Sequence, residues 1–172
     1  MTSPARQRGG GPGKRQGKRK DIHERALGLL AVRQRSRKEL ERRLVQAGFE
    51  AEAVADELER LEQVGLIDDA AFAAAVVESR IGVRGESRRA VGIKLQQAGV
   101  DRDVALAALD QSPGDEQERA DRLAESRAAR VSGLDPATGF ARVSGFLMRR
   151  GYAPAIARQA ARRALGLEGI EA

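Results

Sequence analysis

Two clusters of basic side chains are the residues of this chain that most suggest chemistry, and that chemistry is the binding of anions. Positive side chains of this kind attract phosphates or an acidic protein surface. Each cluster surrounds an expected turn before the second helix of a helical unit. The first cluster contains Arg33, Arg35, Arg37, Lys38, Arg42 and Arg43, and the second contains Arg80, Arg84, Arg88 and Arg89. We predict that these residues bind a partner, although an ordinary solvated helix face explains any one of them equally well.

The start of the chain is a separate basic segment. Residues 1–20 hold seven basic side chains and no acid, whereas the rest of the chain holds 24 basic and 25 acidic side chains. The segment is rich in glycine and poor in large apolar residues, which predicts a disordered tail. Its charges predict a salt-sensitive, non-specific attraction to nucleic acid, and a solubilising tail without a partner is the alternative. The basic residues are Arg6, Arg8, Lys14, Arg15, Lys18, Arg19 and Lys20.

The composition gives little support to catalysis. The chain contains no cysteine and a single histidine, His23, which excludes thiolate catalysis, cysteine-bound zinc and a histidine metal site. The sequence has no phosphate-binding loop, dinucleotide fingerprint or nucleophile elbow. The adjacent acids Asp68 and Asp69 are explained by a helix cap followed by a first-turn carboxylate. We therefore predict that the protein is not an enzyme and uses no metal and no cofactor.

The elements that position the basic clusters recur along the chain. A leucine, three further residues, a glycine and an apolar residue occur together three times, and the glycines lie 51 and then 52 residues apart. A glycine just past a helix end adopts the left-handed conformation without a Cβ penalty, and the next residue folds back onto the helix. The pattern predicts that Gly48, Gly99 and Gly151 end helices in this way, and that Gly65 ends a further helix.

This period predicts an all-α protein of three tandem three-helix repeats in an elongated, curved, solenoid-like array. No segment alternates apolar and polar residues in the manner of a strand. We expect each repeat to bury its apolar face on its neighbour. The predicted organisation is a tail over residues 1–20 followed by repeats over residues 21–67, 68–114 and 115–168. No apolar run approaches the roughly 20 residues that span a bilayer, so we expect a soluble, cytoplasmic monomer.

Local signals mark where the second helix of a repeat begins. Ser36 with Glu39 three residues later is the pattern of a capping box, in which each side chain bonds the backbone of the other. Ser87 occupies the same place in the second repeat. A loop containing Gly82 and Gly85 is expected to lead to it.

Several segments together give the chain a family resemblance. Residues 65–69 read Gly-Leu-Ile-Asp-Asp and are followed by Phe72-Ala73 and Arg80. Ser36-Arg-Lys-Glu-Leu40 lies upstream, and Leu95-Gln-Gln-Ala-Gly99-Val100 lies downstream. With these segments, residues 24–165 resemble the RecX family of regulatory proteins, in which a tryptophan often stands at the position of Val76.

The resemblance implies a fold and a function. Members of the family consist of tandem three-helix repeats and bind the RecA recombinase filament. They settle into its helical groove and restrain its ATPase and strand-exchange activities. The resemblance therefore implies a regulator of RecA in DNA repair, DNA recombination and the SOS response.

A helical module that binds single- or double-stranded DNA directly, with one helix in the major groove, is the alternative function. The near-neutral charge of residues 21–172 favours the protein-binding regulator, because a body that binds duplex DNA is usually distinctly basic. Base stacking is not expected either. Four of the five aromatic residues, Phe49, Phe72, Phe146 and Tyr152, are assigned by their pattern to the core.

Overall fold

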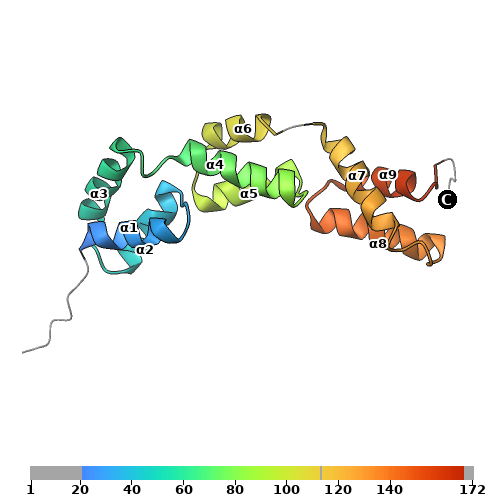
Figure 1. The fold of residues 1–172 in the computed structure, drawn as a ribbon, viewed down its shortest axis with the longest axis horizontal. Helices are drawn as coiled ribbons and strands as arrows, with labels where there is room; N and C mark the ends of the chain where they lie inside the picture. Colours follow the sequence, from blue (N-terminus) through green and yellow to red (C-terminus); the bar gives the residue numbers. More distant parts are fainter. Residues whose placement is uncertain (1–20, 113, 169–172) are drawn as a thin grey trace, which may run out of the picture.

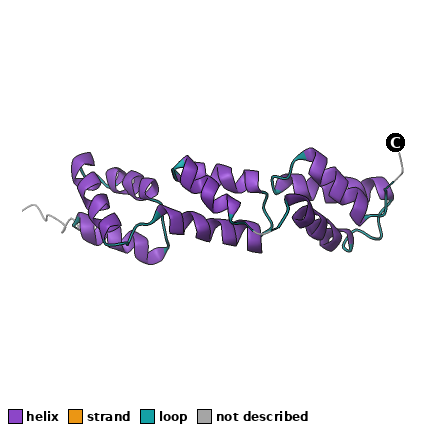
Figure 2. Cartoon of the chain, turned by 90° about the horizontal axis from the view of Figure 1, so that it is seen from above, coloured by secondary structure: helices purple, strands orange, loops and turns teal. Residues whose placement is uncertain are grey.

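The computed structural model describes residues 21–112 and 114–168, and the predicted tail over residues 1–20 lies outside these ranges. Within the described residues the protein consists of nine α-helices and one π-helical segment, with no strand (Figure 2). The predicted all-α class is therefore confirmed. The elements are α1 (Ile22–Val32), α2 (Arg37–Gln46), α3 (Ala51–Gln63), α4 (Asp69–Val77), η1 (Glu78–Val83), α5 (Arg88–Ala98), α6 (Arg102–Asp110), α7 (Glu116–Ala128), α8 (Pro136–Arg149) and α9 (Pro154–Ala164).

The helices form three groups that follow one another in an elongated row (Figure 1). Helices α1–α3 make the first repeat, α4–α6 with η1 the second, and α7–α9 the third. The extensive helix contacts all lie within a repeat: α2 packs on α3, α4 packs on α6, and α7 and α8 both pack on α9. The array of tandem three-helix repeats is thus observed as predicted.

Each repeat encloses a hydrophobic core of its own. Leu40, Leu44 and Leu58 are fully buried in the first repeat, and Leu95 and Leu147 are fully buried in the second and the third. These side chains belong to three separate clusters of buried residues. The expectation that each repeat buries its apolar face on its neighbour is therefore wrong. Three short helices cover one another's apolar faces within a repeat, and little apolar surface remains for the next one.

The predicted glycine turns have the expected backbone geometry. The φ angles are +91° at Gly48, +72° at Gly65, +78° at Gly99 and +91° at Gly151. After each glycine the next N–H donates to a carbonyl one helical turn back. Three such bonds join Phe49 to Leu44 at 3.3 Å, Val100 to Leu95 at 3.1 Å and Tyr152 to Leu147 at 3.3 Å. This pattern is the Schellman motif, which satisfies the last carbonyls of a helix.

The start of the second helix differs from the prediction in one respect. Ser36 Oγ accepts from the backbone N–H of Glu39 at 3.1 Å, and Ser87 Oγ accepts from that of Ala90 at 3.1 Å, so both serines cap their helices. The capping box is incomplete, because the Glu39 carboxylate is directed to arginine side chains instead of the Ser36 backbone. A guanidinium partner offers a charged hydrogen bond, which is stronger than one from a neutral N–H.

The loop expected around Gly82 is also different. Helix α4 continues into the π-helical turn η1, and the chain leaves the helix at Arg84 and Gly85, where φ is +62°. π-helical turns are rare and occur mostly as single turns within or beside α-helices. Ile81 in this turn is buried in the core of the second repeat, which explains why the helix extends that far.

Neighbouring repeats meet through a polar junction that occurs twice. At the first junction the backbone N–H of Arg37, the first residue of α2, donates to Asp69 Oδ1 at 2.8 Å. At the second junction the backbone N–H of Arg88, the first residue of α5, donates to Glu116 Oε1 at 3.1 Å. Asp69 and Glu116 are the first residues of α4 and α7. One carboxylate therefore begins each following repeat and satisfies a helix N–H of the repeat before it.

The glycine turns complete these junctions. Ser36 Oγ donates to the carbonyl of Ala98 beside Gly99, and the N–H of Ser87 donates to the carbonyl of Arg150 beside Gly151 at 3.0 Å. A Cβ atom at Gly99 would lie 2.5 Å from the Cβ of Lys38 across the junction. Gly99 and Gly151 thus allow close contact between repeats. No side chain lies within 4 Å of the corresponding point at Gly48 in the first repeat.

The two outer ends of the array lack these junction groups. The first residue of α1 is Ile22, which has no carboxylate in the place of Asp69 and Glu116. The first residue of α8 is Pro136, which has no N–H in the place of Arg37 and Arg88. Among the described residues, no helix is both long and apolar enough to cross a bilayer.

Candidate partner-binding surfaces

The basic cluster of the first repeat is organised around one carboxylate. Glu39 on α2 forms ion pairs with Arg33 at 2.5 Å and Arg43 at 3.3 Å, and it also pairs with Arg35. Arg35 is buried, and its Nε donates to the carbonyl of Leu29 at 3.0 Å. The side chain is therefore committed to the interior, and we remove Arg35 from the predicted binding residues.

The ion pairs keep the Glu39 carboxylate charged. Burial favours its neutral form, but the charge of Arg33, the hydrogen bond and charge of Arg35 and the hydrogen bond of Arg43 together outweigh burial. The pKa of Glu39 is therefore lower than its ordinary value.

The other members of the first cluster also have ion-pair or hydrogen-bond partners. Arg37 pairs with Glu62 at 3.0 Å, and Lys38 pairs with Glu41 at 2.9 Å. Arg42 donates across the first junction to a backbone carbonyl of α5 at 3.1 Å. Three acids, Glu39, Glu41 and Glu62, thus pair with five of the six basic side chains, which lowers the net positive charge of the cluster without cancelling it.

The second cluster is divided into paired and unpaired members. Arg80 pairs with Glu86 at 3.0 Å, and Arg88 pairs at 2.6 Å with the carboxylate that ends α6. Arg84 and Arg89 are exposed and form no ion pair with any residue that the structure describes. Of the ten predicted binding residues, these two combine an exposed position with a charge that no acid or carbonyl of the described chain neutralises.

Burial also affects the acid at the first junction. Burial raises the pKa of Asp69 above its ordinary value, and the nearby charge of Glu62 adds to this effect. The hydrogen bond from the Arg37 backbone and the charge of Arg37 oppose the shift without cancelling it. Asp69, predicted as a first-turn carboxylate that stabilises its own helix, thus also contacts the preceding repeat.

The third repeat carries a surface that the prediction omitted. No acid occurs between Asp135 and Glu168, a stretch that covers all of α8 and α9 and contains six arginines. Of these, Arg163 forms ion pairs with Asp121 at 2.8 Å and Glu168 at 3.2 Å. The other five form no ion pair with the described residues: Arg142, Arg149, Arg150, Arg158 and Arg162. The missing acids are a sequence signal that could have identified this surface.

An aromatic ring organises part of this surface. The guanidinium groups of Arg127 on α7 and Arg150 after α8 lie over the ring of Phe146, at 5.4 Å and 4.6 Å from its centroid. Such cation–π contacts hold a guanidinium group in a fixed orientation. The predicted assignment of Phe146 to the core is correct in part, because the ring is half-buried and packs against the third core.

One buried acid has no signal in the sequence. Glu57 on α3 is 1% exposed, whereas the helix has several other acids that face solvent. Its carboxylate accepts from Arg60 at 2.5 Å and contacts His23 Nδ1 at 2.7 Å. His23, whose side chain is 51% exposed, therefore joins α1 to α3 and supports the first repeat.

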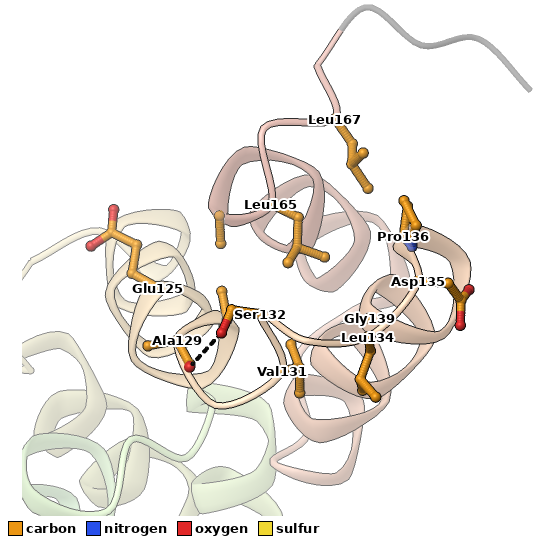
Figure 3. Close-up of a pocket in the computed structure, with 12 residues that line it drawn as sticks. Glu125, Ala129, Val131, Ser132, Leu134, Asp135, Pro136, Gly139, Leu165 and Leu167 are labelled. Carbon is orange, nitrogen blue, oxygen red and sulfur yellow. Dashed lines mark hydrogen bonds between the residues drawn. The ribbon is translucent and has the colours of Figure 1, made fainter.

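A cavity of about 480 Å³ opens between α7, α8 and α9 at the end of the array (Figure 3). Its lining is largely apolar and includes Val131, Leu165 and Leu167, while Glu125 and Asp135 lie on opposite sides of it. Within the described ranges, no three His, Cys, Asp or Glu side chains come together as metal ligands. The cavity offers shape and apolar contact, and its polar groups do not converge on one point.

These features place the protein in the class of tandem helical-repeat proteins. Its described residues present charged surfaces. Comparison with known proteins identifies the family. The chain matches the models of the first, second and third three-helix domains of RecX over residues 23–61, 68–109 and 115–161. It is 38% identical over 156 residues to the regulatory protein RecX of Thermobifida fusca (strain YX), covering 88% of this chain and 84% of that relative. The chain belongs to the RecX family of regulatory proteins.

Other relatives and a solved structure agree with this assignment. The regulatory protein RecX of Mycobacterium sp. (strain JLS) is 40% identical over 141 residues, which cover 78% of this chain and 76% of the relative. The crystal structure of RecX from Lactobacillus salivarius superposes with a TM-score of 0.70 at 22% identity, over 85% of this chain and 95% of that one. At this identity the superposition supports the fold alone.

Proposed function

We propose that this protein binds the RecA recombinase filament and inhibits its ATPase and strand-exchange activities, and so regulates DNA repair and recombination. The observation that carries the proposal is the match of all three repeats to the RecX domains. In this proposal the protein acts as a cytoplasmic monomer and contributes contacts instead of catalysis.

The shape of the molecule supports binding to a polymer. An elongated row of repeats with separate cores contacts several successive subunits of a filament (Figure 1). Junctions built from a few hydrogen bonds allow small adjustments between repeats. Many modest contacts that act together produce high affinity, as linked binding sites do.

The distribution of charge supports a protein partner. Helix α3 exposes Glu52, Asp56 and Glu59, whereas the second repeat exposes Arg84 and Arg89. A surface with both signs suits a protein partner whose charges alternate in the same way. We propose that Arg84 and Arg89 contact the filament, with the ion-paired members of the two predicted clusters at the rim.

Direct binding to DNA is the second candidate function. The run of α8 and α9 without acids favours it, since unpaired arginines attract phosphates. A protein that acts only in this way would reduce RecA activity by covering the DNA, without contacting RecA.

One titration distinguishes the two functions. RecA ATP hydrolysis on a fixed amount of single-stranded DNA is measured while this protein is added. We expect hydrolysis to fall at a protein concentration well below that of DNA binding sites, and further DNA should not restore it. Unchanged hydrolysis contradicts the proposal, and full recovery on adding DNA favours the second candidate.

A further inference from the structure

We infer that the third repeat carries a binding surface for the phosphate backbone of a nucleic acid, formed by Arg127, Arg142, Arg149 and Arg150 around Phe146. We call it the Phe146 surface. The inference rests on the proposed function, because it assigns to one repeat the contact with the nucleic acid that a recombinase filament holds.

The charge of this surface has one sign. Arg142, Arg149 and Arg150 lie within the stretch from Pro136 to Leu167 that contains no acid. None of the three, nor Arg127, forms an ion pair with a residue in the described part of the chain. No ion pair therefore lowers the positive potential of these arginines, whereas in the first repeat Glu39 offsets one of the three charges of the arginines that it contacts.

Helix geometry places these residues together. Residues 142, 146 and 149 follow one another at intervals of four and three, so they share one face of α8. Val143 and Leu147 occupy the adjacent, buried face. Seven residues of helix rise about 10 Å, which separates Arg142 from Arg149 along one face of α8. The two side chains are thus spaced to contact different phosphates of one strand.

Phe146 orients two of the arginine side chains. Two guanidinium groups lie over its ring, which leaves little ring surface for stacking with a base. A stacked guanidinium can still use the N–H groups at its edge, and its planar fork matches the oxygens of a phosphate. The Nε of Arg127 is buried, so Arg150 is the stacked side chain better placed for such a contact. The arrangement therefore favours recognition of the backbone over recognition of bases.

The same surface is poorly suited to a protein partner. Protein interfaces have an apolar centre formed by large exposed side chains, with charges at the rim. Helix α8 exposes one large apolar side chain, Met148, at 41%. A patch of four arginines with so little exposed apolar surface fits a polyanion better.

The test measures binding of the full-length protein to fluorescent single-stranded oligo(dT) of 30 nucleotides by anisotropy, over a range of salt concentrations. The variant is Arg149→Gln with Arg150→Gln. Since each lost phosphate contact on a single strand reduces the salt slope by about 0.7, we expect the slope to fall by about 1.4 and affinity to fall on the order of 10-fold at 0.1 M salt. A second variant, Arg142→Gln with Arg149→Gln, changes two exposed residues and should behave in the same direction.

The matched control is Arg25→Gln with Arg102→Gln, which removes two exposed charges from the first and second repeats. It should leave the slope within about 0.3 of the parent, because few phosphates contact those positions. A control that weakens binding as much as the variants, or variants with an unchanged slope, would overturn the inference.

Failure of the inference is distinguishable from failure of the proposed function. If the variants lose inhibition of RecA but bind oligo(dT) normally, the Phe146 surface contacts protein and the inference is wrong while the function stands. If the parent protein does not inhibit RecA but its DNA binding depends on the surface, the inference stands and the proposed function fails.

Discussion

The first and third repeats have the same three-helix architecture, yet they use their basic side chains in opposite ways. In the first repeat an acid lies beside almost every cluster member, and Glu39 alone contacts three arginines. In the third repeat Arg163 is paired, while Arg142, Arg149 and Arg150 are not paired with any acid in the described ranges. The density of arginine in a sequence therefore does not measure the charge available to a partner. The positions of the acids decide it.

Glu39 illustrates how sequence spacing produces this difference. It lies four residues before Arg43 on one side of α2, whereas Arg35 precedes the helix and reaches Glu39 from the segment before Ser36. On α8 the same spacing places Arg142 and Phe146 on one face, and the Phe146 ring, in place of a carboxylate, lies under the guanidinium groups of Arg127 and Arg150. The carboxylate of Glu39 stabilises the first repeat through ion pairs. The arrangement around Phe146 leaves positive charge at the surface of the third repeat.

The largest effect is expected from removing the central carboxylate of the first cluster. Glu39→Gln leaves the buried Arg35 guanidinium without a counter-charge, and the loss of one partner of a buried pair costs about 3–5 kcal/mol of unfolding free energy. Hydrogen exchange of amides in α1 and α2 measures the loss. The control Glu41→Gln breaks the exposed pair with Lys38 and should cost less than about 1 kcal/mol. Equal losses in the two variants would show that the Arg35 contact is unimportant.

A smaller effect on the free energy of unfolding is expected from alanine at the glycine turns of the first and third repeats. Gly48 and Gly151 both have φ of +91°, so alanine at either position costs about 1–2 kcal/mol in backbone strain. A Cβ at position 151 would also lie 2.6 Å from the Cβ of Ala90, whereas nothing lies within 4 Å at position 48. We expect Gly151→Ala to lose a further 1–3 kcal/mol, roughly, from overpacking at the junction. Thermal unfolding of both variants tests this, and equal midpoints would contradict the contact.

Acid is expected to have an effect no larger than that of Glu39→Gln, because protonation of Glu39 removes the same charge. The folded-state pKa of Glu39 is lowered, so its contribution to stability is complete above its unfolded value near 4.5 and is lost as pH falls through the folded value. Hydrogen exchange should therefore show the first repeat losing protection as pH falls below about 4.5. The Glu39→Gln protein should lack this part of the pH dependence. An identical pH profile in the variant would assign the effect to other acids.

The fold was largely predictable because the repeat has local signals. The turns at Gly99 and Gly151 and the caps Ser36 and Ser87 depend on residues within one helix and its end, and the structure contains each of these turns and caps. The separate cores were not predicted, since an apolar helix face does not reveal which helix will cover it.

The candidate surfaces were less predictable, because they depend on contacts between distant segments. Asp69 bonds the backbone of Arg37, 32 residues away, and Glu57 contacts His23, 34 residues away. Neither contact has a marker in the sequence. The Phe146 surface is different, since the absence of acids in α8 and α9 is visible in the sequence. The prediction followed the density of arginines, which is higher in the first repeat.

Pro136 and Ile22 have a consequence for how molecules of this protein behave toward one another. A head-to-tail contact that repeats without closing on itself produces fibres of indefinite length. The junction between repeats is a contact of this kind, and copying it between molecules would join α8 of one to α1 of the next. Pro136 has no N–H to donate, and Ile22 has no carboxylate to accept it. The hydrogen bond that joins neighbouring repeats therefore lacks both its donor and its acceptor where α8 of one molecule would meet α1 of another.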